Sequence, residues 1–267
     1  MNTALRFADH AQEANKVNPC ITIYVAMQGS QNYGLDYAES DVDTKAITVP
    51  TLRQIVKNTK PMSYTYVRDN NEHIDFKDIR LMFDCFRKQN INFIEILFTD
   101  YFWIQPYYSA ELQELRKNAE DIARMDPYAA VKCMKGMAYE KFHALEHPYP
   151  AKAAIIAEHG YDGKQLSHLR RLEEFLTKYI AGESYSKCLK SDNREELILL
   201  KQHYLPLNEA RALAEETVQK VAVIADEFCN FADRETFKNQ KTFQLLEDLQ
   251  YDIVKKSLER EVKGYVE

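Results

Sequence analysis

Two short stretches, Gly29-Ser30-Gln31-Asn32-Tyr33-Gly34 and Ser40-Asp41-Val42-Asp43, decide the fold of this 267-residue chain. The first follows residues 21–27, Ile-Thr-Ile-Tyr-Val-Ala-Met, an apolar and β-branched run that is typical of a buried strand. The second opens residues 41–49, which we expect to form another strand that ends before Pro50. The sequence therefore predicts two core strands joined by a segment that begins with a glycine-serine turn.

The two aspartates of the second stretch are separated by a single residue. Residues two apart on a strand point to the same face, so Asp41 and Asp43 should project together, about 6.5–7 Å apart along the chain. Val42 should then point into the core. Paired carboxylates can share hard divalent cations, and Mg2+ takes such oxygen ligands together with substrate phosphates. The pattern predicts a metal site on this strand.

The glycine-serine turn has the composition of a phosphate-binding loop. Gly29 allows the backbone to approach an anion closely, and a short helix from Gln31 would present free N–H groups to it. We therefore expect Ser30 and its neighbouring amides to receive the β- and γ-phosphates of a nucleotide. Ser30 could instead cap the short helix, and one hydroxyl can serve both purposes.

These stretches resemble the polymerase-beta superfamily of nucleotidyltransferases, whose signature is a strand, a Gly-Ser turn, a short helix and an Asp-x-Asp strand. The finer resemblance is to a family of predicted bacterial and phage nucleotidyltransferases, the RNA-repair-pathway polymerase-beta family. It covers residues 20–105 clearly and residues 161–190 more faintly. The residues that carry it are Gly29-Ser30, Tyr33-Gly34, Ser40-Asp41-Val42-Asp43 and Ile74-Asp75-Phe76.

The resemblance implies a third carboxylate, Asp75, which would help bind the catalytic metal and deprotonate the acceptor hydroxyl. Its strand alternates, with Ile74 and Phe76 facing inward and His73 and Asp75 facing outward. Asp75 could also be a solvated strand residue or a helix-capping acid. Two Mg2+ ions are expected at Asp41, Asp43 and Asp75, with Mn2+ as a possible substitute.

The implied reaction is transfer of a nucleoside monophosphate from an NTP, with ATP as the expected donor, to a hydroxyl acceptor. The family's association with RNA repair makes an RNA 3′ end the first acceptor to test. A protein AMP-transferase is the alternative enzyme. A nucleotide-binding, antitoxin-like regulatory module without catalysis is the alternative outside enzymes.

A basic segment in the second half of the chain resembles a family patch that carries lysine, histidine and arginine on one helix. Lys164, His168 and Arg171 fall at i, i+4 and i+7, hence on one helix face. From Lys164 to Lys190 there are six Lys or Arg against three Glu, in an otherwise acidic chain. We expect the three side chains to bind nucleotide or acceptor phosphate; a solvated helix face is the alternative. The family more often has histidine where this chain has Gln165.

The pattern along the chain predicts an α+β protein. Residues 1–107 should form a small mixed-sheet nucleotidyltransferase domain, and residues 108–267 an all-helical domain that closes the cleft. The first part should contain a helix over 2–17, a hairpin of 64–67 with 72–76, a helix that Asp78 caps, and another starting at Asn90 or Asn92. The expected helices of the second part are residues 111–124, 127–145, 163–181, 193–205, 208–232 and 242–262.

Composition narrows the class of protein. Hydrophobic residues make up 45% and charged residues 28% of the chain, as in ordinary globular proteins. The net charge of −6 argues against sequence-blind nucleic-acid binding over the whole surface. Five scattered cysteines without a Cys-x-x-Cys pair indicate reduced thiols and a cytoplasmic location. We expect no signal peptide and no membrane span. The oligomeric state stays open.

Overall fold

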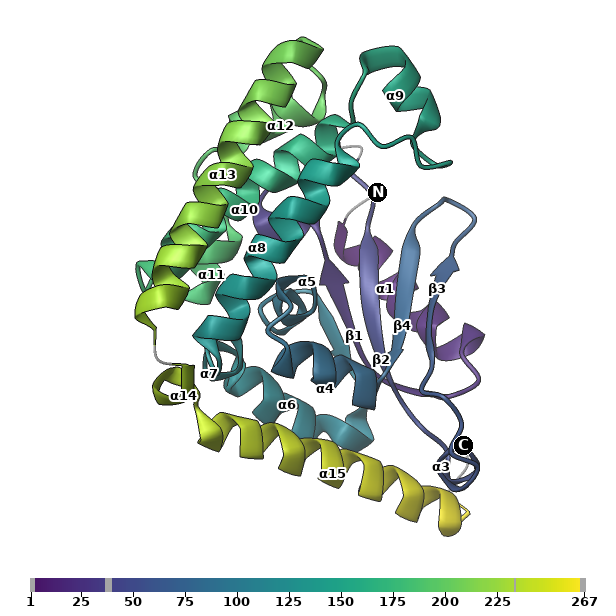
Figure 1. Cartoon of the computed structure of the whole chain (residues 1–267). Coiled ribbons are helices and arrows are strands. Elements are labelled where there is room, and N and C mark those ends of the chain that lie inside the picture. Colours follow the sequence, from purple (N-terminus) through teal and green to yellow (C-terminus); the bar gives the residue numbers. More distant parts are fainter. Residues whose placement is uncertain (1–2, 37–39, 233, 265–267) are drawn as a thin grey trace. The chain divides into compact units, whose positions relative to one another are not determined.

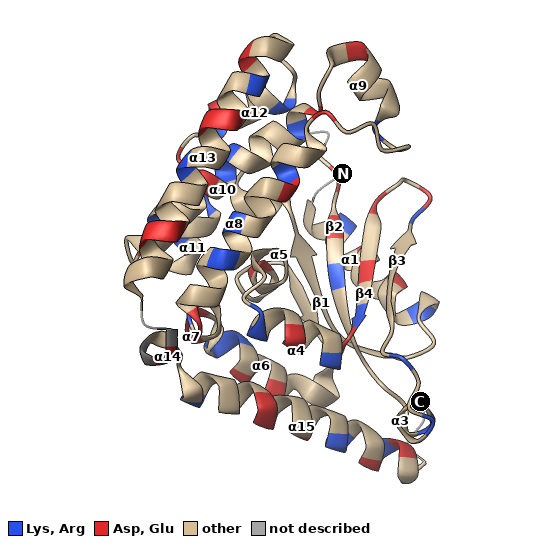
Figure 2. Ribbon diagram, in the orientation of Figure 1, with Lys and Arg blue, Asp and Glu red and all other residues tan. Residues whose placement is uncertain are grey.

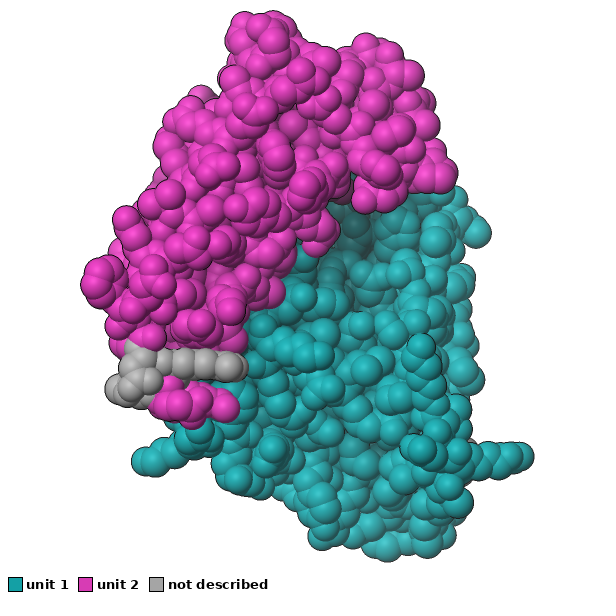
Figure 3. Space-filling model, in the orientation of Figure 1, with its two compact units in different colours: residues 1–32, 37–125, 239–267 teal, residues 33–36, 126–238 magenta. Residues whose placement is uncertain are grey.

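The computed structural model describes residues 3–36, 40–232 and 234–264. The chain forms two units, which Figure 3 distinguishes by colour. Unit 1 contains Met1–Asn32, Tyr37–Met125 and Asn239–Glu267, and unit 2 contains Tyr33–Asp36 and Asp126–Lys238. The chain therefore enters unit 2 twice, first for the four residues that follow the glycine-serine turn.

Unit 1 is built on a mixed sheet, which confirms the predicted α+β class. Within the described residues the sheet has five strands in the order β3-β4-β2-β1-β5 (Figure 1). β2 and β4 are parallel, and the other neighbours are antiparallel. The strands are β1 (Ile21–Gln28), β2 (Asp43–Val49), β3 (Ser63–Val67), β4 (His73–Asp78) and β5 (Phe102–Ile104). The sequence analysis did not foresee β5, an edge strand of three residues.

The second strand starts two residues later than predicted. β2 begins at Asp43, so Asp41 precedes the strand, and the pleat argument for the aspartate pair was wrong for this residue. The physical reason lies in the hydrogen bonds of the preceding backbone. The carbonyl of Ser40 accepts from Arg6, and the N–H of Val42 donates to the carboxylate of Glu72. In residues 40–42, side chains therefore make the backbone hydrogen bonds that a neighbouring strand would otherwise make.

Helices cover both faces of the sheet (Figure 1). α1 (Thr3–Val17) packs on one face through Phe7, Ala11 and Ala14. The opposite face meets α4 (Ile79–Arg87), α5 (Ile91–Ile94) and the 3-10 helix η1 (Glu95–Leu97). The predicted cap of α4 is confirmed, because the Asp78 carboxylate accepts from the backbone N–H of Arg80. The apolar stripe of α4 is buried at Ile79, Met82, Phe83 and Phe86.

The remaining helices of unit 1 are mostly peripheral. The helix predicted over 111–124 is two helices, because Asn118 bonds its side chain back to the Glu114 carbonyl at the break. The last long helix packs on α4 at the bottom of Figure 1. The elements are α3 (Leu52–Val56), η2 (Pro106–Tyr108), α6 (Ser109–Lys117), α7 (Ala119–Ala123) and α15 (Gln240–Val262).

Unit 2 is helical throughout its described residues. Its core is formed where α8, α10 and α13 pack against one another, with α12 against α10. α8, α10 and α13 agree with the predicted ranges to within one residue at each end, whereas the helix predicted over 193–205 ends four residues earlier, at Lys201 of α12. Along the described residues, no helix has the length and apolarity that a membrane span needs. The bounds are α8 (Pro127–Ala144), α9 (Ala153–His159), α10 (Gly163–Ile180), α11 (Tyr185–Leu189), α12 (Arg194–Lys201), α13 (Leu207–Phe231) and α14 (Arg234–Phe237).

Candidate functional site

The register of β1 and β2 brings the glycine-serine turn next to the aspartates. Gln28, the last residue of β1, is paired with Asp43, the first residue of β2. Gly29 follows with φ of +88°, a left-handed backbone that favours glycine. The side chain of Gln31, in the four-residue helix α2 (Ser30–Tyr33), donates to the carbonyl of Asp41 over 2.8 Å. One sheet corner therefore holds both motifs.

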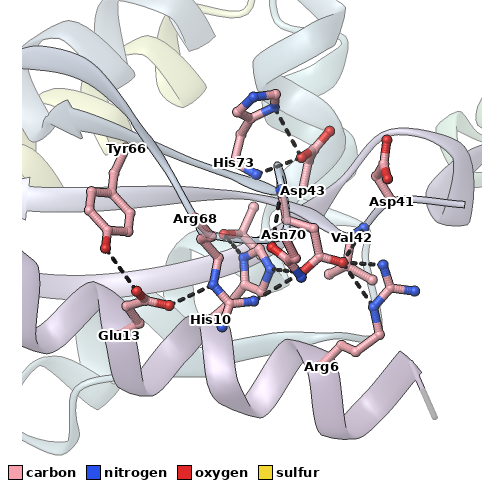
Figure 4. Close-up of polar contacts among 12 residues, drawn as sticks. Arg6, His10, Glu13, Asp41, Val42, Asp43, Tyr66, Arg68, Asn70 and His73 are labelled. Atoms are coloured by element: carbon pink, nitrogen blue, oxygen red, sulfur yellow. Dashed lines mark hydrogen bonds and ion pairs between the residues drawn. The ribbon is translucent and has the colours of Figure 1, made fainter. Parts of the chain in front are cut away.

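Asp41 and Asp43 project to the same side of the sheet, away from α1 (Figure 4). Asp41 is exposed, and Asp43 is partly buried. Oδ1 of Asp43 accepts from the backbone N–H of His73 over 2.8 Å and lies 3.4 Å from the His73 ring nitrogen Nδ1. One aspartate is thus oriented by the neighbouring strand, whereas the other faces solvent.

Asp75 lies on the same face but further along the sheet. It is paired with Lys45 in the parallel β2–β4 register, two positions beyond Asp43. Its carboxylate accepts from Thr65 Oγ1 over 2.6 Å and from Gln28 Nε2 over 3.1 Å. Over the described ranges, no three or more His, Cys, Asp or Glu side chains are close enough together to hold a metal ion. The three-carboxylate centre therefore stays a prediction.

Lys45 is a buried cation among these acids. Its side chain is 6% exposed, and Nζ lies 5.0 Å from the centre of the Phe93 ring. Burial lowers the pKa of Lys45, while the charges of Glu95, Asp75 and Asp43 oppose this shift. Acidic and basic positions lie beside one another along the ribbons of β2 and β4 (Figure 2), as in the pairing of Lys45 with Asp75. The face can therefore accommodate both a cation and an anionic phosphate.

The amide of Gly29 already donates a hydrogen bond to the carboxylate of Glu95, a residue that was not among the predicted site residues. Oε2 of Glu95 accepts from the backbone N–H of Gly29 over 3.2 Å and from Nδ2 of Asn32 over 3.1 Å. Glu95 is 2% exposed, so it forms part of the wall of the turn. Ser30 Oγ lies 3.3 Å from the Gln31 side-chain oxygen. Because the Gly29 amide already donates to Glu95, the Ser30 hydroxyl is the better candidate in this turn for binding a phosphate.

A buried ionic cluster lies beneath the aspartates (Figure 4). At its centre is Glu72, which is 1% exposed and accepts from the Val42 backbone N–H over 3.1 Å. Arg6 and Arg68 both donate to this carboxylate, the latter over 2.9 Å. Burial alone would raise the pKa of Glu72, but hydrogen bonds from His10, Arg6 and other donors lower it to about 2. Glu72 is thus a fixed anion under the site.

His10 completes this cluster from α1. Its Nε2 lies 2.9 Å from Oε2 of Glu72, and its Nδ1 lies 3.0 Å from the Thr44 hydroxyl. Burial lowers the pKa of His10, more than the bond to Glu72 raises it. A neutral His10 ring donates to the Glu72 carboxylate through Nε2 and accepts from the Thr44 hydroxyl at Nδ1. Both ring nitrogens then have a hydrogen-bond partner.

The sequence of α1 contains a signal for this cluster. Arg6, His10 and Glu13 fall at i, i+4 and i+7 of α1, a polar stripe beside the apolar stripe that packs on the sheet. All three join the cluster, Glu13 through its bond to Arg68. A polar stripe next to a buried face predicts buried ionic partners on the opposing element.

The three basic-helix residues belong to α10 in unit 2, and their environments differ. Lys164 is exposed, His168 is partly buried and Arg171 is 4% exposed. Burial, together with the positive charges of Arg171 and Lys164, lowers the pKa of His168 well below its usual value. Leu166, Leu169 and Leu172 of the same helix are buried, and they hold α10 to the core of unit 2.

Arg171 packs on the segment that follows the glycine-serine turn. Its guanidinium lies 3.6 Å from the centre of the Tyr33 ring. Arg194 donates to the carbonyls of Gly34 and Asp36 over 2.9 and 2.8 Å, and the Ser191 N–H donates to the Tyr33 carbonyl over 3.4 Å. Unit 2 thereby anchors the chain just after the turn. Binding of phosphate by Lys164, His168 and Arg171 stays a prediction.

Neither protein-family models nor the sequences of curated proteins include a match to this chain. Among solved structures, the chain is similar to the crystal structure of a nucleotidyltransferase-like protein from Exiguobacterium sibiricum 255-15. The TM-score is 0.32 and the sequence identity 11%, and the match covers 85% of this chain and 76% of that chain. The similarity is distant.

Proposed function

We propose that the chain is a Mg2+-dependent nucleotidyltransferase that transfers a nucleoside monophosphate from an NTP, with ATP as the expected donor, to a hydroxyl acceptor. The observation that carries the proposal is the pairing of Gln28 with Asp43. It places a glycine-serine turn and two aspartates at one corner of the sheet. Nucleotidyl transfer needs both a phosphate-binding loop and oxygen ligands for metal at a single site.

Asp41 and Asp43 have the donor chemistry that Mg2+ requires, because they offer hard carboxylate oxygens on the same side of the sheet (Figure 4). When bound, the two metal ions that we propose neutralise charge on the triphosphate and on the departing pyrophosphate. Asp75 is the third proposed ligand. It approaches from the next strand and already accepts hydrogen bonds from Thr65 and Gln28.

The remaining roles follow from the residues around the turn. The Ser30 hydroxyl donates to a phosphate oxygen, and Lys45 supplies a positive charge beneath the triphosphate. The acceptor oxygen attacks the α-phosphorus, the bond from that phosphorus to the bridging oxygen breaks, and pyrophosphate leaves with the electron pair. Asp75 takes the proton of the acceptor hydroxyl. Lys164, His168 and Arg171 are proposed as phosphate contacts from unit 2.

The first acceptor to test is an RNA 3′ hydroxyl, on the strength of the residue resemblance. The experiment incubates the purified chain with each α-labelled NTP, Mg2+ and either RNA oligonucleotides or a total cell lysate. Label that remains on RNA and depends on its 3′ hydroxyl supports the proposal in full. Label on protein supports nucleotidyl transfer with a protein acceptor instead.

Two controls separate catalysis from contamination. EDTA and Asp43→Asn should each abolish labelling, whereas Asp84→Asn, an exposed acid of α4, should not. If the wild-type chain binds an NTP but labels no acceptor with any metal, the enzyme proposal is wrong. The remaining alternative would then be a nucleotide-binding regulatory module without catalysis.

A further inference from the structure

We propose that Arg6 and Glu72 form a clamp that holds the backbone on both sides of Asp41 and so positions Asp41 and Asp43 for a divalent cation. Both are positioning residues, because they act through the backbone of residues 40–42. The inference rests on the proposed function, which assigns the cation to these aspartates. It adds two residues, one of them from the first helix of the chain, to the machinery of the site.

The clamp consists of an ion pair that holds two peptide groups. Arg6 Nη1 donates to the carbonyl of Ser40 over 3.0 Å, and Arg6 Nε donates to Oε1 of Glu72 over 2.8 Å. The same Oε1 accepts from the backbone N–H of Val42 over 3.1 Å. Ser40 and Val42 are the two neighbours of Asp41. One ion pair therefore holds the residue before Asp41 and the residue after it.

The clamp is anchored by groups that do not depend on the aspartates. The second oxygen of Glu72, Oε2, lies 2.9 Å from Nε2 of the buried His10, which anchors the carboxylate. Arg68 Nη1 donates to the same oxygen over 2.9 Å, and its loss would leave the His10 anchor in place. Glu72 is 1% exposed, so water does not compete for these bonds. A buried carboxylate with this many donors has one orientation, since any other leaves buried charges unpaired.

The clamp also replaces hydrogen bonds that a strand would have supplied. β2 begins at Asp43, and residues 40–42 lie outside the strand. Asp41 therefore has no ladder to fix its direction, although it must share a cation with Asp43, which the His73 backbone N–H orients. Groups that orient metal ligands without touching the metal typically alter metal affinity 10- to 100-fold when they are removed.

Arg68 offers a matched control for a purely structural role. Like Arg6, it is a partly buried arginine that pairs with Glu72, with 16% of its side chain exposed against 21% for Arg6. It bonds Oε2 rather than Oε1, and its other acid partner is Glu13. If the cluster only stabilises the fold, Arg6→Met and Arg68→Met should have similar effects. If Arg6 belongs to a clamp, only Arg6→Met should disturb the metal site.

The test is a titration of the full chain with Mn2+, without nucleotide, followed by the electron paramagnetic resonance signal of the free ion. Arg6→Met is expected to raise the apparent Kd about tenfold or more. Arg68→Met is expected to leave it near the wild-type value. Equal weakening in both variants, or no weakening in Arg6→Met, would overturn the clamp. Should Arg6→Met not fold, Arg6→Lys replaces it, because lysine cannot bond Glu72 and Ser40 with the same geometry.

A second measurement separates the clamp from the proposed function. Amide exchange of Val42 in the metal-free chain, followed by NMR, should be faster in Arg6→Met than in the wild type and in Arg68→Met. If the wild-type chain binds no Mn2+, the proposed function fails, and Val42 exchange alone decides whether the clamp exists. Exchange at the same rate in all three proteins would overturn it.

Discussion

The backbone N–H of His73 donates to Oδ1 of Asp43 over 2.8 Å and so joins the first residue of β4 to the first residue of β2. A backbone donor cannot titrate or change rotamer, so it holds the Asp43 carboxylate in this direction. Asp41 is exposed, and within the described part of the chain its side chain has no comparable bond to a neighbouring strand. The two aspartates are therefore oriented by different means, Asp43 directly and Asp41 through its backbone.

Asp41→Asn and Asp43→Asn should each reduce nucleotidyl transfer more than about 100-fold, since removal of a metal-binding charge costs roughly 3 kcal/mol or more in the transition state. Circular dichroism should show an unchanged fold. The measurement is kcat/KM for labelled product at saturating Mg2+. Asp84→Asn on α4 serves as the control, and near-normal turnover in either site variant would refute the metal assignment.

Ser30→Ala should weaken binding of a non-hydrolysable NTP by roughly 10- to 150-fold, because one hydrogen bond to a charged group contributes about 1.5–3 kcal/mol. Isothermal titration in Mg2+ measures the effect. Ser109→Ala, at the start of α6, is the matched control. Unchanged affinity would leave Ser30 only as the first residue of α2.

Lys164→Ala should raise KM for the NTP several-fold at low ionic strength, and the difference should shrink as salt is added. The exposed ammonium group of Lys164 attracts phosphate over a distance set by the Debye length. Added salt shortens this length, to about 10 Å at 0.1 M. Lys117→Ala removes a comparably exposed lysine from α6 and should have no such effect. An increase in KM that does not depend on salt would contradict an electrostatic role of Lys164.

The Arg171–Tyr33 contact should stabilise unit 2 directly. A double-mutant cycle with Arg171→Met and Tyr33→Leu, measured by chemical denaturation, should give a coupling free energy of about 0.5–2 kcal/mol. The control cycle uses Lys132 and Tyr128, whose contact is longer at 5.3 Å and involves an exposed lysine. Coupling no larger than in the control would mean that Arg171 does not hold the segment after the turn.

Glu72 should make stability depend on acidity in a defined window. Because its pKa is lowered to about 2 in the folded chain, the stabilisation is present above about pH 4.5 and is lost as pH falls toward 2. The full contribution is on the order of 3 kcal/mol. Urea denaturation between pH 6 and 2 should show a flatter profile for Glu72→Gln than for wild type. Glu140→Gln, an exposed acid of α8, should follow wild type, and parallel profiles for Glu72→Gln would disprove the assignment.

Much of the architecture could be predicted because local patterns determine it. The alternation of Ile74 and Phe76 with His73 and Asp75 predicted the buried and solvent faces of β4, and Asp78 predicted the start of α4. The long helices of unit 2 were found from their 3.6-residue periodicity. The three-residue β5 was missed because its strand character comes from pairing with β1 rather than from its own sequence.

The candidate site was likewise predictable only in part from the sequence. The sequence by itself determined that a glycine-serine turn follows one core strand and that two aspartates lie at the start of the next strand along the chain, because apolar runs, glycine and acidic pairs are local signals. Only the tertiary structure decided that Asp41 lies before the strand and that Arg6 and Glu72 hold its backbone. It also decided that Glu95 occupies the Gly29 amide and that Arg171 packs on Tyr33. These partners are 30 to 138 residues apart, from the Glu72–Val42 bond to the Arg171–Tyr33 contact, and no local pattern encodes which distant charge meets which backbone group. Burial selects them, because each polar group removed from water must find a partner wherever the fold provides one.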